Sequence, residues 1–415
     1  MSETNGKRRV VVTGIGVVTP IGLDVPEFWS GIRAGRCGVN ALGGFPLDDL
    51  KILIAAQVKD FEPRARLKSY KRDKIVTMAD RYSWFAAAAA AEAVAMSGLE
   101  TPLSNPYRAA CIIGSGAGGL TTLESNYRYL FIEGKRATHP LTLLRIIGSS
   151  ASAHVGIEYG VKGPTFATCS ACSTATHAIG IARDYIRHGM VDVAIAGASE
   201  AVINYGTMKA WQALHVLSPE GCFPFAKKRN GTVLGEGAGI LVLEELEHAR
   251  KRGATILAEL VGYGMSSDSK DMVNPETEGP AHAMREALSD AELEPDRIDY
   301  LNAHGTATTI NDVNETNAIK EVFGDHAGRL AISSTKSMHG HPLGAGGGIE
   351  AAACIMAMRD NWAPPTIGLD EPGEGCDLDY VPNVGREMQI DYAMSNSFAF
   401  GGLNAVLVFG RPPAA

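Results

Sequence analysis

The segment that decides the interpretation of this chain is Thr168-Cys169-Ser170-Ala171-Cys172-Ser173-Thr174-Ala175-Thr176-His177-Ala178-Ile179-Gly180. It places a cysteine among small residues, and the sequence from Ala171 to Ala182 contains no Asp, Glu, Lys or Arg. A stretch without charge on any side predicts a buried helix. The first turn of a helix carries unpaired N–H groups and partial positive charge, which favour a thiolate. We therefore expect Cys172 to ionise readily and to act as a nucleophile.

The composition of the chain limits its class. Its 415 residues suffice for two domains or one large duplicated domain, and 45% hydrophobic with 20% charged residues is typical of a globular protein. The net charge of −8 argues against general nucleic-acid binding. No signal-peptide pattern is present, and apolar runs end before membrane-spanning length. Seven scattered cysteines predict reduced thiols and a cytoplasmic location.

The order of predicted elements repeats along the chain. Continuous apolar runs predict strands that are covered on both faces of a sheet. Besides a strand just before Cys172, the runs of the first half are residues 10–16, 109–116, 191–196 and 238–243. The second half repeats the order with residues 256–262, 300–305, 331–336, 394–400 and 405–409. This repetition predicts an internal duplication, in which strand-end loops of both halves surround one shared site.

Three glycine-rich loops of the second half carry polar residues directly after predicted strands. Residues 302–308 include His304, residues 333–347 include Lys336 and His341, and the third loop is residues 395–404. Glycines at strand ends allow a ligand to approach the backbone closely. Cysteine with histidine fits acyl transfer, and neutral histidines can stabilise an oxyanion or an enolate. Backbone N–H groups at 398–402 are candidates for an oxyanion hole together with that of Cys172.

A charged segment marks the expected boundary between the halves. Residues 244–253 read Glu-Glu-Leu-Glu-His-Ala-Arg-Lys-Arg-Gly, which is typical of an exposed helix. We therefore predict an N-terminal half at residues 1–252 that carries the nucleophile. The C-terminal half, residues 253–415, would carry the histidine, lysine and phenylalanine loops.

Taken together and in this order, these motifs resemble the β-ketoacyl-acyl carrier protein synthases of the elongating, ketosynthase II type. The resemblance extends from Val-Val-Val-Thr-Gly at 10–14 to Asn-Ala-Val-Leu at 404–407, and it includes Leu-Gly-Glu-Gly-Ala-Gly at 234–239. It implies a thiolase-like α/β fold with two duplicated halves in five αβαβα layers. It also implies a dimer, either of two identical chains or with a chain-length factor.

Two positions depart from the usual pattern of that family. Ala307 stands where a glycine is frequent, and Leu403 stands where a threonine often occurs. Leu403 and the His339-Gly340-His341 pairing also resemble specialised ketosynthases, such as the nodulation type that makes unusual unsaturated chains. We expect His339 itself to hydrogen-bond within its loop.

The resemblance implies roles for the three reacting residues. Cys172 would take the acyl chain from a carrier-protein thioester. His304 and His341 would bind the carbonyl of a malonyl thioester and stabilise the enolate that forms when CO₂ leaves. No metal or organic cofactor is implied, because phosphopantetheine arrives attached to the acyl carrier protein.

The resemblance also implies roles for four supporting residues. Lys336 would tune the electrostatics of the site, and Glu350 would hold the loops from behind. Phe400 would gate the site beside the nucleophile. Leu123 would line the acyl tunnel, although its simpler interpretation is a core residue.

Residues 64–74 form a local basic run in an acidic chain. The plain interpretation is a solvated helix face. The alternative is a docking surface for an acidic acyl carrier protein, since electrostatic steering suits a transient partner. The residues that we assign to this surface are Lys68, Lys71, Arg72, Lys74, Lys135 and Arg136.

Other functions stay open at this point. A thiolase acting on coenzyme A thioesters fits the Gly-His-Pro-Leu-Gly motif at 340–344, but it needs a second catalytic cysteine, and residues 398–404 contain none. A chain-length factor lacks the nucleophile, so Cys172 favours the active subunit of such a pair. The Cys169-x-x-Cys172 spacing is compatible with a redox pair or half a zinc site, but no second pair has zinc-like spacing.

Overall fold

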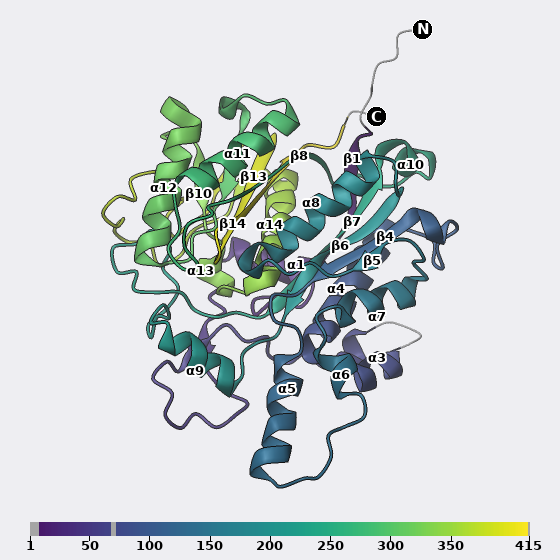
Figure 1. Ribbon diagram of the computed structural model, residues 1–415. Helices are drawn as coiled ribbons and strands as arrows, with labels where there is room; N and C mark the ends of the chain where they lie inside the picture. Colours follow the sequence, from purple (N-terminus) through teal and green to yellow (C-terminus); the bar gives the residue numbers. More distant parts are fainter. Residues whose placement is uncertain (1–7, 68–71, 414–415) are drawn as a thin grey trace.

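The computed structural model describes residues 8–67 and 72–413. A ten-stranded sheet runs through the molecule, and its two halves have the same internal strand order (Figure 1). The first half has the order β1 (Val10–Val18), β7 (Gly237–Glu245), β6 (Val193–Glu200), β4 (Ala109–Gly114) and β5 (Thr165–Phe166). The second has the order β8 (Ala258–Ser267), β14 (Leu403–Gly410), β13 (Tyr392–Ala399), β9 (Tyr300–Asn302) and β10 (Ala331–Ser333).

The strand directions repeat as well as the order. In each half the neighbouring strands among the first three run antiparallel to one another. The last three strands, β6–β4–β5 and β13–β9–β10, run parallel to one another. Within the described sheet, the two halves are joined by β1 and β8, which share the pairs Val11–Glu259 and Val12–Ala258. The duplicated fold is therefore confirmed, whereas the division after residue 252 stays a prediction.

Helices form three layers around the two halves of the sheet (Figure 1). The outer layer of the first half consists of α4 (Arg81–Ser97) and α7 (Ser150–Tyr159). The outer layer of the second half consists of α11 (Glu278–Ala291) and α12 (Thr309–Phe323). The layer between the halves consists of α8 (Thr174–Arg187) and α14 (Gly346–Asp360). This is the predicted five-layer α/β architecture.

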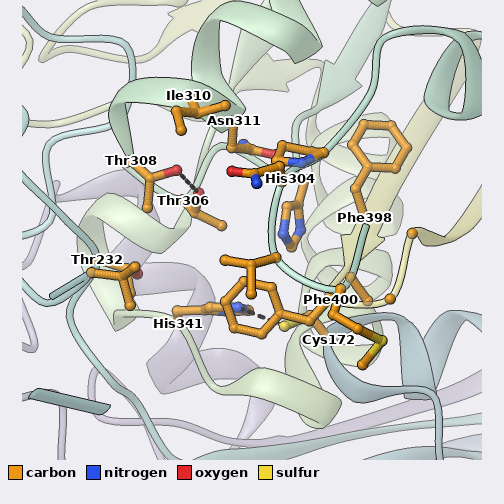
Figure 2. Close-up of a pocket in the computed structure, with 18 of the residues that line it drawn as sticks. Cys172, Thr232, His304, Thr306, Thr308, Ile310, Asn311, His341, Phe398 and Phe400 are labelled. Carbon is orange, nitrogen blue, oxygen red and sulfur yellow. Dashed lines mark hydrogen bonds between the residues drawn. The ribbon is translucent and has the colours of Figure 1, made fainter. Parts of the chain in front are cut away.

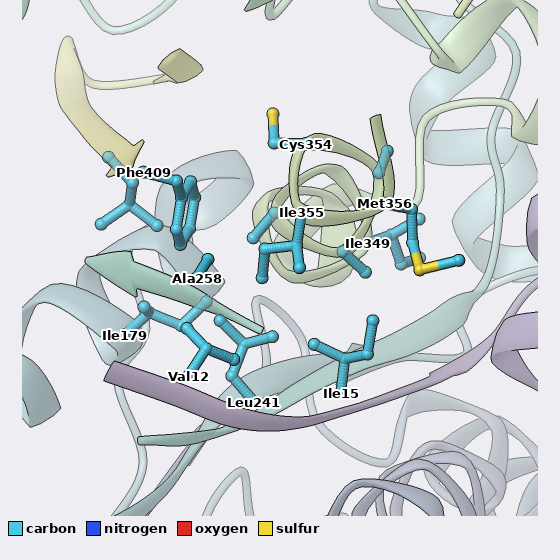
Figure 3. Close-up of a cluster of buried hydrophobic side chains, with 14 of the residues drawn as sticks. Val12, Ile15, Ile179, Leu241, Ala258, Ile349, Cys354, Ile355, Met356 and Phe409 are labelled. Carbon is cyan, nitrogen blue, oxygen red and sulfur yellow. The ribbon is translucent and has the colours of Figure 1, made fainter. Parts of the chain in front are cut away.

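The central helix α14 is buried on all sides (Figure 3). Its Ile349 and Ile355 pack in the same core cluster as Ile15 of β1 and Leu241 of β7. Glycines allow the close contact: a Cβ placed on Gly239 would lie 2.2 Å from the backbone of Gly348. Because α14 packs against both halves, it can hold loops from both halves in register.

The charged segment between the halves differs from the prediction. Only Leu246–Lys251 forms a helix, α10, and Glu244 is fully buried near the end of β7. Burial alone would raise the pKa of Glu244, but hydrogen bonds from Arg252, His248 and Thr13 lower it to about 2. The prediction of an exposed helix is therefore wrong at Glu244, whose buried carboxylate anchors the segment that connects the two halves.

Within residues 8–67 and 72–413, no helix is both long enough and apolar enough to cross a membrane.

Candidate active site

Cys172 lies in a tight turn at the entrance to α8. The turn is a short 3₁₀ helix, Ala171–Ser173, and Ala171 has φ +47°, which is rare for a residue with a side chain. The hydroxyl of Thr174 holds the turn, because it donates to Ala171 O at 2.7 Å and accepts from Ser170 N at 2.9 Å. The helix proper begins only at Thr174, so Cys172 precedes it rather than lying in its first turn.

The predicted reacting residues lie together, although they come from different halves of the chain (Figure 2). His341 Nε2 lies 3.1 Å from Cys172 Sγ. The rings of His304 and His341 are nearly perpendicular, with centroids 5.4 Å apart. The tautomer of His341 that carries its proton on Nδ1 can accept the thiol proton at Nε2.

The loop of His304 is held by a carboxylate that the sequence analysis missed. Glu315, on α12, accepts hydrogen bonds from His304 N at 2.8 Å, from Gly305 N at 2.7 Å and from Asn396 Nδ2 at 3.2 Å. Burial raises the pKa of Glu315 to about 7. In the sequence, Glu315 is only a glutamate in the stretch that follows the 302–308 loop. Nothing there distinguishes it from a glutamate exposed to solvent.

Lys336 and Glu350 form a buried ion pair behind the histidines. Lys336, on α13 (Lys336–His339), is 1% exposed and Glu350, on α14, is fully buried. Lys336 Nζ donates to Glu350 Oε1. Burial, together with the positive charge of Lys336, holds the pKa values of His304 and His341 well below the usual range. Both imidazoles are therefore neutral near pH 7.

The expectation that Cys172 ionises readily is wrong for the free protein. Burial raises the pKa of the Cys172 thiol to about 12, although the charge of Lys336 and a backbone hydrogen bond from Phe400 oppose this shift. The carboxylates of Glu200 and Glu350 add to it. Cys172 is therefore a thiol that needs a base, and His341 is the base in contact with it.

A cavity of about 270 Å³ opens onto Cys172, His304 and His341. Phe400 also lines it and lies beside the cysteine, as predicted (Figure 2). The Phe400 ring stacks on Trp211 of α9 (Tyr205–Ala213), with centroids 5.7 Å apart. The site can therefore hold a substrate between the two catalytic halves of the chain.

Two further predicted residues lie away from this cavity. His339 is not among the residues that line the cavity. Its ring nitrogens lie 2.9 Å from Gly340 O and 3.1 Å from Thr335 Oγ1, so it hydrogen-bonds within its loop as expected. Leu123, on α5 (Leu120–Tyr127), is half-buried and is not among the residues around the cavity. Its assignment to an acyl tunnel stays a prediction.

The predicted docking residues are only partly visible. Lys74 on α3 (Arg72–Met78) is exposed, and so are Lys135 and Arg136 in the loop after η2 (Arg128–Ile132). Lys68 and Lys71 lie outside the described residues, as does the side chain of Arg72. Their shared role in docking stays a prediction.

All seven cysteines are free. Across residues 8–67 and 72–413, no group of three or more His, Cys, Asp or Glu is arranged to hold a metal ion.

A duplicated five-layer α/β fold with a cysteine and two neutral histidines at the junction of its halves defines a condensing enzyme of the thiolase-like class. Comparison with known families agrees. The N-terminal domain of β-ketoacyl synthases matches residues 7–249, and their C-terminal domain matches residues 257–370. The chain belongs to the β-ketoacyl synthase family and is an acyltransferase.

Similar proteins cover nearly the whole chain. Nodulation protein E of Rhizobium sp. (strain N33) is 45% identical over 97% of this chain and 99% of its own. The 3-oxoacyl-[acyl-carrier-protein] synthase 2 of Coxiella burnetii (strain RSA 493 / Nine Mile phase I) is 46% identical over 98% and 99%. Among solved structures, the ishigamide ketosynthase/chain length factor is 35% identical with a TM-score of 0.94, over 98% of this chain and 100% of that one.

Proposed function

We propose that this protein lengthens an acyl chain on an acyl carrier protein by two carbons, using a malonyl unit that loses CO₂. The observation that carries the proposal is the 3.1 Å contact between Cys172 Sγ and Nε2 of a neutral His341, with the ring of His304 5.4 Å from that of His341. The name of the Coxiella relative supports a carrier protein as the substrate.

The first step loads the acyl chain onto Cys172. His341 Nε2 takes the thiol proton, and Sγ forms a bond with the acyl carbon of the incoming thioester. The bond between that carbon and the phosphopantetheine sulfur breaks, and the released sulfur takes up the proton. Burial makes the free thiolate costly, so the proton leaves as the new bond forms.

The second step removes CO₂ from the malonyl unit. The C–C bond to the carboxylate breaks, and its electron pair moves into an enolate on the thioester. N–H groups of His304 and His341 donate to the enolate oxygen, which for His341 requires its proton on Nε2. With Cys172 acylated, no thiol competes for that nitrogen. Burial, reinforced by the charge of Lys336, keeps both rings neutral, so each ring has one N–H to donate and one nitrogen free.

The third step joins the two units. C2 of the enolate attacks the acyl carbon on Cys172, the bond to Sγ breaks, and the thiolate takes up a proton from solvent. The product is a 3-oxoacyl carrier protein, and CO₂ has already left in the second step. The steps use ionisable side chains and N–H donors, and we propose that phosphopantetheine enters only with the carrier protein.

We also propose that the chain works as a homodimer in the cytoplasm. Large apolar side chains are exposed on η2 and on α6 (Thr142–Ile146), with Phe131 78%, Ile132 71% and Leu143 70% exposed. Exposed apolar patches mark protein interfaces. Pairing with a chain-length factor is the alternative that the solved relative suggests. The free cysteines fit a reducing compartment.

Product analysis tests the proposal. Purified protein is incubated with an acyl carrier protein thioester and a malonyl carrier protein, and the carrier-bound product is read by mass spectrometry. We expect a 3-oxoacyl chain that is two carbons longer. Turnover with coenzyme A thioesters alone, and none with carrier proteins, would favour a thiolase instead.

A further inference from the structure

Thr232 is an unexplained polar residue in the catalytic cavity. Three described residues combine a buried, unpartnered polar side-chain atom with a place on the cavity wall, namely Thr232, His304 and His341. The two histidines have roles in the proposed reaction. Thr232 is 2% exposed, and its Oγ1 has no hydrogen-bond partner.

The backbone around Thr232 fixes the direction of its side chain. Thr232 N donates to Val216 O at 2.8 Å, and Ser218 N donates to Thr232 O at 2.8 Å, so the segment is extended and paired. The next residue, Val233, packs in a buried cluster with Cys222 and Ala307. Because side chains alternate along an extended segment, Thr232 points to the opposite side, where the cavity lies (Figure 2).

The same segment ties Thr232 to the catalytic loop. His341 N donates to Val233 O at 2.7 Å, and Leu234 forms a bridge with His341. Thr232 therefore has a fixed position relative to the imidazole that acts on the thioester. A buried hydroxyl without a partner is unfavourable, and a ligand oxygen in the cavity would satisfy it.

The charges around the cavity indicate which substrate oxygen would accept a hydrogen bond from the Thr232 hydroxyl. No lysine or arginine is among the described residues that line it. The carboxylates of Asp268 and Asp271 line its wall, and Lys336 does not reach it because it is paired with Glu350. A cation beside the malonyl carboxylate would stabilise the charged ground state and so oppose decarboxylation. A neutral hydroxyl can orient the carboxylate and stabilises that ground state less.

We propose that the Thr232 hydroxyl donates a hydrogen bond to the carboxylate of the malonyl unit and so orients that unit for decarboxylation. The inference rests on the proposed function. Thr232 keeps its proton throughout. As the C–C bond breaks, the carboxylate becomes neutral CO₂ and the hydrogen bond is lost, so the contact orients the leaving group without transferring anything.

The test compares Thr232→Val, which keeps the shape and removes the hydroxyl, with Thr232→Ser, which keeps the hydroxyl. Two rates are measured for each: loading of Cys172 from an acyl carrier protein, and CO₂ release from malonyl carrier protein. We expect Thr232→Val to raise the KM for malonyl carrier protein about ten-fold, the value of one hydrogen bond to a charged group. Loading should change far less, and Thr232→Ser should stay near wild type.

Thermal unfolding separates this role from a structural one. Because the hydroxyl has no partner in the free protein, the melting temperature of Thr232→Val should equal or exceed that of wild type. A lower melting temperature, an unchanged KM or an equal loss of loading would overturn the inference. Failure of the wild-type protein to load Cys172 or release CO₂ would instead overturn the proposed function, and this inference with it.

Discussion

At the scale of single residues, the site depends on the environment of Cys172. The sulfur is buried beside a neutral imidazole, and its pKa of about 12 makes the thiol the resting form. Reactivity therefore depends on contact with His341, not on ionisation in advance. The position of the nucleophile could be predicted from the sequence, because the cysteine stands among small residues before an uncharged stretch. Its pKa could not, because burial depends on loops from both halves.

Alkylation of the free protein by iodoacetamide tests this protonation state. Since burial raises the thiol pKa to about 12, the alkylation rate of Cys172 should still be increasing at pH 9 without levelling off. Peptide mass spectrometry gives the rate, and the exposed Cys37 serves as an internal control. A rate that reaches a plateau below pH 8 would show a thiolate in the free protein.

The two histidines should differ when each is replaced by alanine. His304 has no described contact with the thiol, so His304→Ala should slow CO₂ release about 100-fold and slow loading much less. His341 lies 3.1 Å from the sulfur, so His341→Ala should slow both steps. Radiolabelled CO₂ release and single-turnover acylation measure the two effects. Equal effects of both substitutions on loading would contradict these separate roles.

At the scale of elements, α13 and α14 hold the site together through Lys336 and Glu350. The motif around Lys336 indicated an active-site lysine, and the structure pairs it with the predicted glutamate. By contrast, Glu315 was not predicted, because only folding brings α12 against the loop of His304. Glu244 was misjudged for a similar reason, since a charged segment gives no sign that one carboxylate is buried.

Substitutions in this ion pair should be strongly non-additive. Glu350→Ala leaves the Lys336 ammonium buried without its partner and should cost about 3–5 kcal/mol of unfolding free energy. The double variant Lys336→Met with Glu350→Leu removes both charges and should be more stable than Glu350→Ala. Chemical denaturation followed by circular dichroism measures both. A Glu350→Ala protein as stable as wild type would contradict a tight buried pair.

At the scale of the whole molecule, the duplication places the nucleophile and the histidines on opposite halves of one cavity. The repeated order of apolar runs made this arrangement predictable, because each half contributes strands in the same sequence. The surfaces were less predictable. Apolar residues such as Phe131 and Leu143 cannot be distinguished from core residues in the sequence, and the structure shows that both are exposed.

The assembly prediction concerns these exposed apolar residues. Phe131→Asp with Leu143→Asp should convert a homodimer into a monomer, because charged groups at an apolar interface are unfavourable. Light scattering after size-exclusion chromatography measures the mass, and circular dichroism checks the fold. Lys74→Asp is the matched control, since it introduces the same charge at an exposed site on α3. A wild-type monomer that dimerises only with a chain-length factor would contradict the homodimer.

The central claim is that the acyl chain is carried by Cys172. Intact and peptide mass spectrometry after incubation with a hexanoyl carrier protein tests it most directly. We predict one hexanoyl group on the peptide that contains Cys172, and none on the Cys172→Ala protein under the same conditions. An unmodified Cys172 in the wild-type protein, or the same label in Cys172→Ala, would contradict the account.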